Sequence, residues 1–428
     1  MSTVTIKGKS IASGSPITLR GSIQVPASKS HTIRALLIGS LAEGSSRIHQ
    51  PLYSADTLSC LDACRKLGAV IEDCKDGWKV LSPIPFGAGE DVYIDVGNSG
   101  TSLYLLTAIA AVLGRKVHFD GDDQIRSRSA GRLLNALKAL GAEVESSEDG
   151  YAPYWVKGPL KGGECSIECP TSQYLSALLL AAPLLESSDR ECRIKVPLLM
   201  EQPYAEMTLK WMERQNIRWQ QKEMKEFTIS GGQKYRSFDA VIAADFSSAT
   251  FFFCAAALTG STLLIKGLDM EDSQGDKAVL DYLSTMGASI RHTEKGIEVR
   301  GGQLKGAVLD LNDTPDALPA MAVTACYAKG ETRIINVPQA RMKETDRISV
   351  MTAELRKMGA EIEETPDGMI IQGSPLTGNT VKGHGDHRVV MSLAIASLGA
   401  VGETVIDTAE AVNITYPGFF EQFEILRP

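Results

Sequence analysis

The chain has 428 residues, which at about 150 residues per domain allows two or three domains with sizeable cores. Its 43% hydrophobic and 22% charged residues are ordinary for a globular protein, and the net charge of -8 argues against a nucleic-acid-binding surface while leaving room for a local basic pocket. The eight cysteines form no CxxC pair and indicate reduced thiols of a cytoplasmic protein. The opening MSTVTIKGKS lacks a signal segment and no apolar run reaches the 18 or so residues of a membrane span, so we expect no membrane partner.

In chain order, the first predicted elements are two alternating strands in VTIKGKSIASGSPITLRGSI, on either side of a Ser-Gly-Ser-Pro turn. A pattern then recurs six times, in which a short polar cluster opens an apolar helix that leads into a Gly-bounded strand. One marker residue in each cluster, at 28, 99, 171, 247, 315 and 386, gives steps of 71, 72, 76, 68 and 71 residues. Periods of this length indicate a repeated supersecondary unit. The clusters are Ser28-Lys29-Ser30, Asn98-Ser99-Gly100-Thr101, Thr171-Ser172-Gln173, Phe246-Ser247-Ser248, Thr314-Pro315-Asp316 and Asp386-His387-Arg388.

A hairpin-like string follows the same period. It begins at 67 with LGAVIEDCKDGWKVLSP and returns at 140, 286 and 358, with a blurred copy at 214. The predicted unit is therefore helix, strand, helix, strand, turn, strand. After 386 the chain gives one apolar helix, a strand at GETVID and a last short helix near Phe419 to Ile425, so the sixth unit lacks its hairpin and we expect the N-terminal strands to supply it. The sequence thus predicts two similar domains of three repeats each, residues 21–241 and residues 1–20 with 242–428.

The six helix starts are candidate anion sites, because unpaired N–H groups and the positive end of the helix dipole lie there. Ser, Thr, Asn and Asp also cap helices without further function, and for any one cluster that is the simpler interpretation. Capping alone, however, would leave the six clusters interchangeable. They differ in the extra group that each carries, namely Lys29, Gly100, Gln173, Asp316 and Arg388.

Two stretches also concentrate cations before a helix. The fifth copy inserts Arg341, Lys343, Glu344, Asp346 and Arg347 where the first copy has none of them, and GDDQIRSRSAGR carries Arg126, Arg128 and Arg132. Such charges most often form a solvated helix face. At a helix entrance, however, the dipole disfavours cations unless an anion is bound, and guanidinium groups grip carboxylate or phosphate through two parallel hydrogen bonds. We therefore predict a small polyanionic ligand between the domains.

The motifs VPASKSHTIRALL, GNSGT, DDQIRSRSAGR, TSQYLSALLL, NDTPDALPAMA, RMKETDRI, GDHRVVMSLA and TYPGFFEQF resemble, in order and spacing, those of the 5-enolpyruvylshikimate-3-phosphate (EPSP) synthases. The resemblance covers nearly the whole chain. It implies an α/β (α+β) fold of two domains, each made of three βαβαββ repeats arranged as an inside-out barrel or prism with buried helices and with the active site in the cleft between them. It also implies a cytoplasmic monomer without metal or other cofactor. The implied reaction transfers the enolpyruvyl group of phosphoenolpyruvate to the 5-hydroxyl of shikimate 3-phosphate and releases phosphate.

Residue by residue, the resemblance implies three sets of roles. Asp316 would accept the proton of the attacking hydroxyl, Glu344 would transfer a proton near the methylene carbon, and Lys29 would lie near both ligands. The contacts implied for shikimate 3-phosphate are Lys29, Ser30, Arg34, Thr171, Ser172, Gln173, Asp316, Gln339 and Lys343. Those implied for phosphoenolpyruvate are Lys29, Asn98, Gly100, Arg128, Gln173, Arg347, His387 and Arg388.

Some positions depart from the family pattern. Glu201 stands where the family has a serine of the phosphate site, so either its carboxylate turns away or Gln202 replaces it. Ile414 stands where many members carry a lysine, and Ser129 where a proline usually follows the arginine. Gly100 leaves space at its helix start, so the resemblance predicts binding of glyphosate, the family's competitive inhibitor.

Two other functions are compatible with parts of the pattern. The related UDP-N-acetylglucosamine enolpyruvyl transferases share the architecture, but they typically carry Lys-Asn where this chain has Lys29-Ser30, and often a cysteine in a loop that here, from Gly121 to Arg132, has none. A non-catalytic anion-binding protein would have no use for Asp316 and Glu344 beside bound phosphates. A metal site at His384 and His387 is weakly indicated, since two histidines without further ligands rarely suffice.

Overall fold

The computed structural model describes residues 2–8 and 17–427, and the Ser-Gly-Ser-Pro turn predicted at 13–16 lies outside them. The chain divides into two compact units, Ala27–Ile242 and a second unit made of Met1–Pro26 with Ala243–Pro428. The chain passes from one unit to the other after Pro26 rather than after residue 20, because residues 20–24 form a strand that pairs inside the second unit. Among the described residues, no helix is long and apolar enough to cross a membrane.

The unit Ala27–Ile242 contains three copies of one motif. In each copy two neighbouring strands pair in parallel and pack against a buried helix. One of these two strands, β3, β7 or β11, also pairs antiparallel with one strand of a β-hairpin. The sheets have the orders β14-β3-β5-β4, β6-β7-β9-β8 and β10-β11-β13-β12. The elements are α1 (Lys29–Leu41), β3 (Ser46–His49), α2 (Ala55–Lys66), β4 (Val70–Cys74), β5 (Gly77–Ser82), β6 (Val92–Asp95), α3 (Gly100–Leu113), β7 (Lys116–Asp120), α4 (Asp123–Arg126), α5 (Gly131–Ala139), β8 (Glu143–Glu145), β9 (Tyr154–Lys157), β10 (Gly163–Ser166), α6 (Gln173–Ala181), η1 (Ala182–Leu184), β11 (Glu191–Lys195), α7 (Gln202–Arg214), β12 (Gln220–Lys222), β13 (Glu226–Ser230) and β14 (Asp239–Val241).

The unit that holds both chain ends repeats the same motif. Its sheets have the orders β16-β17-β15-β2, β18-β19-β21-β20 and β1-β23-β22. The elements are β1 (Val4–Lys7), β2 (Arg20–Gln24), α8 (Phe246–Thr259), β15 (Thr262–Lys266), η2 (Gly275–Ala278), α9 (Val279–Met286), β16 (Ser289–Thr293), β17 (Gly296–Arg300), β18 (Val308–Asp310), η3 (Pro315–Ala317), α10 (Leu318–Cys326), β19 (Glu331–Ile335), η4 (Pro338–Met342), α11 (Arg347–Lys357), β20 (Glu361–Thr365), β21 (Gly368–Gln372), β22 (Thr380–Val381), α12 (His387–Gly399), β23 (Glu403–Ile406), η5 (Ala409–Ile414) and α13 (Phe419–Leu426).

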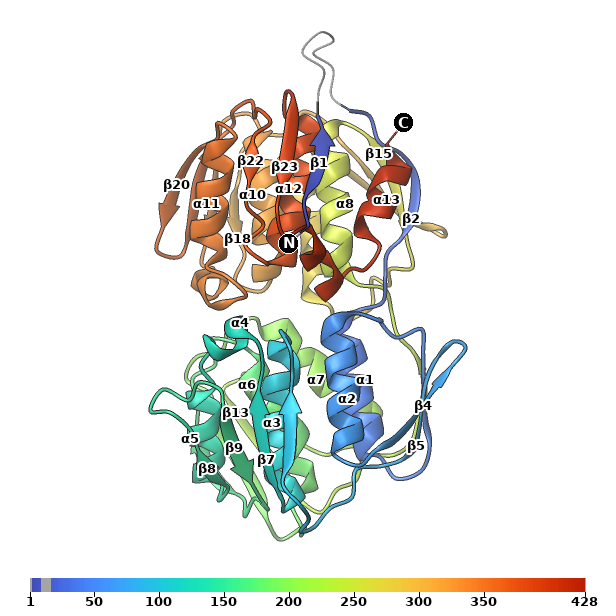
Figure 1. Cartoon of the computed structure of the whole chain (residues 1–428), viewed down its shortest axis with the longest axis vertical. Helices are drawn as coiled ribbons and strands as arrows, with labels where there is room; N and C mark the ends of the chain where they lie inside the picture. Colours follow the sequence, from blue (N-terminus) through green and yellow to red (C-terminus); the bar gives the residue numbers. More distant parts are fainter. Residues whose placement is uncertain (1, 9–16, 428) are drawn as a thin grey trace. The chain divides into compact units, whose positions relative to one another are not determined.

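The N-terminal strands do not form the hairpin expected for the sixth repeat, and that prediction is wrong. Only β1 joins the last sheet, where it runs antiparallel beside β23 (Figure 1). β2 pairs in parallel with β15 and so serves as the first strand of the fourth repeat. β14 has the same relation to β3 in the other unit. Before the chain passes into the other unit, it therefore forms a last strand in the unit where it has been, β2 at the first crossing and β14 at the second.

In both units the first helix of each repeat lies inside and the sheets lie outside. All of α3 is buried, as are all of α10 and α12, since these helices are apolar around their whole circumference. Helices α3 and α6 pack side by side in the core of their unit (Figure 1). The second helices, such as α5 and α7, bury one face only. Among the described residues, each unit is thus a prism of three separate, open sheets around buried helices, as the family resemblance implied, without a closed barrel.

Candidate active site

At four of the six predicted helix starts a side chain caps the helix, in three cases from the predicted cluster and in one from Asp245, directly before the cluster Phe246-Ser247-Ser248. In these four, a side chain at the N-cap accepts a hydrogen bond from a backbone N–H of the first turn. The N-cap residues of α6 and of η3, the short 3-10 helix that leads into α10, make no such side-chain bond, so Ser172 and Thr314 are not explained by capping. The four capping residues are Ser28, Ser99, Asp245 and Asp386.

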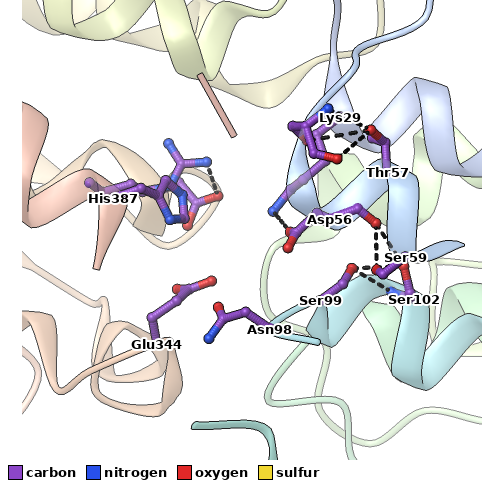
Figure 2. Close-up of polar contacts among 12 residues, drawn as sticks. Lys29, Asp56, Thr57, Ser59, Asn98, Ser99, Ser102, Glu344 and His387 are labelled. Carbon is purple, nitrogen blue, oxygen red and sulfur yellow. Dashed lines mark hydrogen bonds and ion pairs between the residues drawn. The ribbon is translucent and has the colours of Figure 1, made fainter. Parts of the chain in front are cut away.

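In the first repeat, the start of the second helix contacts the start of the first. The amine of Lys29 lies 2.9 Å from Oδ2 of Asp56, in the first turn of α2 (Figure 2). The Lys29 side chain is 16% exposed and that of Asp56 only 2%. A buried carboxylate therefore fixes the amine of the predicted catalytic lysine. Sequence reasoning missed Asp56. Comparing equivalent positions of the repeats could have revealed it, because Arg128 and Arg347 also lie at or just before the second helix of their repeats.

In the second repeat, Gly100 and Arg128 touch. A Cβ atom added to Gly100 would lie 2.7 Å from Nη1 of Arg128, so the glycine makes room for the guanidinium group. The amide of Asn98, at the same helix start, donates to Asp122 at 2.7 Å and to Gln124 at 2.6 Å. The structure thus brings three of the residues predicted for phosphoenolpyruvate together.

The two neighbouring arginines, Arg126 and Arg132, lie at the surface instead. Arg126 pairs with Asp120 at 2.7 Å and is half exposed. Arg132, also half exposed, lies 3.3 Å from Glu168. Of the three arginines in GDDQIRSRSAGR, Arg128 is therefore the one placed beside the helix start of α3.

In the third repeat, Glu201 faces the cluster that precedes α6. The hydroxyl of Thr171 donates to Oε2 of Glu201 at 3.2 Å, and that of Ser172 donates to the same oxygen at 3.4 Å. Glu201 is 1% exposed, so its carboxylate does not turn away. Gln202 instead donates to Glu206 at 2.7 Å. Neither alternative drawn from the sequence describes this arrangement.

Arg34 lies in the core of the same unit and is 1% exposed. Its guanidinium donates to the carbonyl of Ser30 at 3.1 Å, to the carbonyl of Tyr204 at 3.0 Å and to the hydroxyls of Thr208 at 2.8 Å and Ser176 at 3.2 Å. Burial lowers its pKa to about 10, which still leaves it charged at neutral pH. Arg34 therefore ties α1 to α6 and α7 and fixes the backbone at Ser30.

In the other unit, Arg347 is the centre of a buried ionic cluster. Its Nε donates to Asp386 at 2.8 Å, its Nη1 to Asp316 at 2.7 Å and its Nη2 to Glu344 at 2.5 Å. Nη2 also reaches the second oxygen of Asp386 at 3.2 Å. The opposite oxygen of Asp316 lies 2.9 Å from Arg388. The two predicted catalytic carboxylates, Asp316 and Glu344, are thus held by one guanidinium group.

The charges around Asp316 decide its protonation state. Burial alone would raise the pKa of this carboxyl, but Arg388, Lys343 and Arg347 together lower it below its usual value. Burial also disfavours the charged form of Arg347, yet Asp386 and the other carboxylates raise its pKa. Asp316, Asp386 and Arg347 are therefore charged near pH 7.

A further buried acid lies beside this cluster and was not predicted. Asp276, in η2, accepts a hydrogen bond from Ser247 at the start of α8. Burial and the charge of Asp316 raise the pKa of Asp276. Its position before the second helix of the fourth repeat corresponds to that of Asp56 in the first, which is again the signal that could have found it.

The remaining predicted residues of this unit lie near the same helix starts or in the core. Gln339 is 1% exposed and donates to the carbonyl of Asn312 at 2.7 Å. His387 is fully buried in the first turn of α12, whereas His384 lies 2.8 Å from Glu354. Ile414 packs, half-buried, against the hydrophobic core, so no cation occupies its position.

Metal binding finds no support in the geometry of the described residues. Among them, no group of three or more His, Cys, Asp or Glu side chains could hold a metal ion. His384 is directed to Glu354, so it does not join His387 in a common ligand set.

Repeated α/β units with buried helices, and helix starts that carry lysine, arginine and ionised carboxylates, define a class of repeat-built enzymes for small anionic substrates. The family model described as EPSP synthase (3-phosphoshikimate 1-carboxyvinyltransferase) matches residues 14–423. The chain therefore belongs to the EPSP synthase family, whose members are transferases.

Named relatives and solved structures agree with this assignment. The 3-phosphoshikimate 1-carboxyvinyltransferase of Ruminiclostridium cellulolyticum is 50% identical over 404 residues, which are 94% of this chain and 95% of that protein. The enzyme of the same name from Methanocaldococcus jannaschii is 40% identical over 420 residues, 95% of this chain and 96% of the relative. A solved EPSP synthase from Acinetobacter baumannii covers 100% of this chain and 98% of its own, at 26% identity and a TM-score of 0.81.

Proposed function

We propose that the chain transfers the enolpyruvyl group of phosphoenolpyruvate to the 5-hydroxyl of shikimate 3-phosphate and releases phosphate, as a step of the shikimate pathway to chorismate and the aromatic amino acids. The observation that carries this proposal is the match to the family along nearly the whole chain. The buried cluster around Arg347 supports it, because it retains two ionisable carboxylates that an anion-binding protein would not need.

The reaction needs a base and an acid at adjacent positions. The attacking hydroxyl must lose a proton while the methylene carbon gains one, which gives a tetrahedral intermediate that then expels phosphate. Asp316 accepts the hydroxyl proton, and its lowered pKa keeps it ionised and ready to do so. Glu344 serves the methylene carbon. General acid–base catalysis of this kind contributes roughly 10²- to 10⁴-fold to the rate.

Cations supply the remaining stabilisation. Lys29, Arg128 and Arg388 neutralise the carboxylate and phosphate of phosphoenolpyruvate and the phosphate that leaves. Arg347 has five N–H donors, and the contacts described within its unit use four of them, so one remains for a substrate oxygen. The full set of phosphoenolpyruvate contacts that we propose is Lys29, Asn98, Gly100, Arg128, Gln173, Arg347, His387 and Arg388.

The acceptor uses a second set of groups. Thr171 and Ser172 offer hydroxyl donors to the phosphate of shikimate 3-phosphate. Arg34 holds the backbone at Ser30, and the contacts described within its unit use four of its five N–H donors, which leaves one for a substrate oxygen. The full set of acceptor contacts that we propose is Lys29, Ser30, Arg34, Thr171, Ser172, Gln173, Asp316, Gln339 and Lys343.

Release of phosphate by the purified protein tests the proposal. Phosphoenolpyruvate is supplied with shikimate 3-phosphate in one reaction and with UDP-N-acetylglucosamine in another, without added metal. Release that depends on shikimate 3-phosphate supports the proposed acceptor, and release that depends on UDP-N-acetylglucosamine would assign the related transferase activity. A folded protein that binds either ligand but releases nothing would be a non-catalytic anion-binding protein.

We also propose that the protein acts as a cytoplasmic monomer. All eight cysteines are free thiols, which suits a reducing compartment. Sedimentation of the active protein at assay concentration tests the monomeric state directly.

A further inference from the structure

At the cluster before α6, the proposed site carries the negative charge of Glu201 where a bound phosphate would need neutral or positive donors. If the proposed function holds, the hydroxyls of Thr171 and Ser172 donate to the phosphate of the acceptor. In the structure both donate to a single oxygen of Glu201, at 3.2 and 3.4 Å. Each hydroxyl has one proton to donate, so it cannot serve the carboxylate and a phosphate oxygen at the same time.

The backbone holds Glu201 in this position. The residue directly precedes α7 and adopts φ 57° and ψ 40°, a left-handed conformation that a glutamate rarely adopts. About one and two turns later, the carbonyl of Tyr204 and the hydroxyl of Thr208 accept hydrogen bonds from the buried Arg34. Because α7 is tied to α1 in this way, phosphate binding must displace the Glu201 side chain rather than the helix.

The corresponding contacts in the other repeats of this unit have a different charge character. Asp56 faces an amine, that of Lys29, and the guanidinium of Arg128 faces a glycine. In the third repeat an acidic group faces two neutral hydroxyls. The two hydroxyls can bind either the Glu201 carboxylate or an anionic ligand, and in the structure the carboxylate occupies them.

We propose that Glu201 is a specificity-determining residue, an internal anion that competes with the phosphate of the acceptor for the hydroxyls of Thr171 and Ser172. The carboxylate weakens binding of the phosphorylated acceptor in two ways. It withholds two donors, and it repels the phosphate charge if it stays nearby. Binding of phosphoenolpyruvate, which uses other groups, is not subject to this competition.

Kinetics of charge-removing variants test the proposal. Glu201→Gln keeps the shape and removes the charge, while Glu201→Ser also opens space for the phosphate. In both, the KM for shikimate 3-phosphate should fall by about tenfold or more, where tenfold corresponds to about 1.4 kcal/mol. The KM for phosphoenolpyruvate should stay within about threefold, and the effect should appear in KM rather than in kcat. Glu206→Gln is the matched control, because it removes an equal charge from the same helix at a residue that bonds Gln202.

A second probe separates this proposal from the proposed function. Inorganic phosphate should bind the Glu201 variants more tightly than the wild type in calorimetric titrations, whether or not the protein turns over. If wild-type protein releases no phosphate from the substrates but the variants still gain affinity for inorganic phosphate, only the proposed function fails. An unchanged or higher KM for shikimate 3-phosphate in both folded variants, with no gain for inorganic phosphate, would overturn the role of Glu201.

Discussion

Asp316→Asn is the most direct test of the mechanism. In the wild type, one oxygen of Asp316 accepts from Arg347 at 2.7 Å and the other lies 2.9 Å from Arg388. The substitution keeps the size of the side chain but removes its charge and its ability to accept a proton. Its amide nitrogen must then face one of the two guanidinium groups, which loses an acceptor.

The expected loss falls on kcat. Loss of a general base costs about 10²- to 10⁴-fold in rate, which corresponds to about 2.7 to 5.4 kcal/mol of transition-state stabilisation. Substrate binding should change little, because Arg347 and Arg388 remain and face one negative charge fewer. The KM values should therefore stay within about threefold of wild type, while kcat falls by the full amount.

The assay is steady-state phosphate release between pH 5 and 9. Since Arg388, Lys343 and Arg347 lower the pKa of Asp316 despite its burial, the wild-type carboxylate stays ionised over this whole range and is protonated only below about pH 4. An acid limb near pH 6 would instead report Asp276, whose pKa is raised by burial and by the charge of Asp316. A fall in kcat of less than about tenfold in Asp316→Asn would contradict the base role. So would a large rise in KM with unchanged kcat. Asp281→Asn, an exposed acid on α9, is the control for charge loss in the same unit.

Three other predictions follow from individual contacts. Lys29→Met should lower kcat to less than about a tenth of wild type, because it removes a charge near both substrates, and phosphate release measures it. Gly100→Ala should raise the inhibition constant of glyphosate, since the new Cβ would lie 2.7 Å from Nη1 of Arg128, and equal constants would contradict this. Asp386→Asn should lower the free energy of unfolding at pH 7 by about 3 to 5 kcal/mol, because Arg347 loses a buried partner. The pKa of Asp386 is lowered in the folded protein, so its stabilisation is present above about pH 4 and is lost as the pH falls further; urea unfolding of both proteins at pH 7 and pH 3 should show the difference shrinking.

The regular period made the repeats predictable. Each polar cluster marks the start of an apolar stretch, and in the structure α1, α3, α6, α8 and α12 begin within two residues of these marks. Local chemistry suffices here, because capping groups, apolar runs and glycines each act over a few residues. The hairpins at 70–82 and 361–372 follow for the same reason.

Strand pairing over long distances was not predictable in the same way. The alternation in residues 20–24 indicates a strand but contains nothing that selects its neighbour. β2 pairs with β15, more than two hundred residues further along the chain, because a parallel partner is chosen by the tertiary fold. β14 pairs with β3 in the same way, so only a comparison of equivalent positions in the repeats could have suggested that β2 pairs with β15.

The candidate site divides along a similar line. Lys29, Arg128, Asp316 and Glu344 belong to recognisable motifs, whereas Asp56 is a single acid in an ordinary stretch. Nothing local distinguishes it from a surface residue, and its 2% exposure depends on the packing of α2 against α1. The inward direction of Glu201 depends on a left-handed backbone that its sequence does not indicate.

The repeat also explains where functional groups can occur at all. A first helix that is buried along most of its length is largely apolar, and its charged groups lie in its first two turns, as Lys29 and Arg34 do in α1 and Arg388 does in α12. The second helix is amphipathic, and its start can carry a charge toward that turn without burying an unpaired ion, as Asp56 does with Lys29. Each repeat therefore offers one pair of positions whose charges can vary independently of the core. Three of these pairs, Lys29 with Asp56, Gly100 with Arg128 and Asp316 with Arg347, combine a cation with a small or acidic partner. In the pair formed by Ser172 and Glu201 a carboxylate accepts from a hydroxyl that we assign to the phosphate of the acceptor, and we place the control of acceptor affinity there.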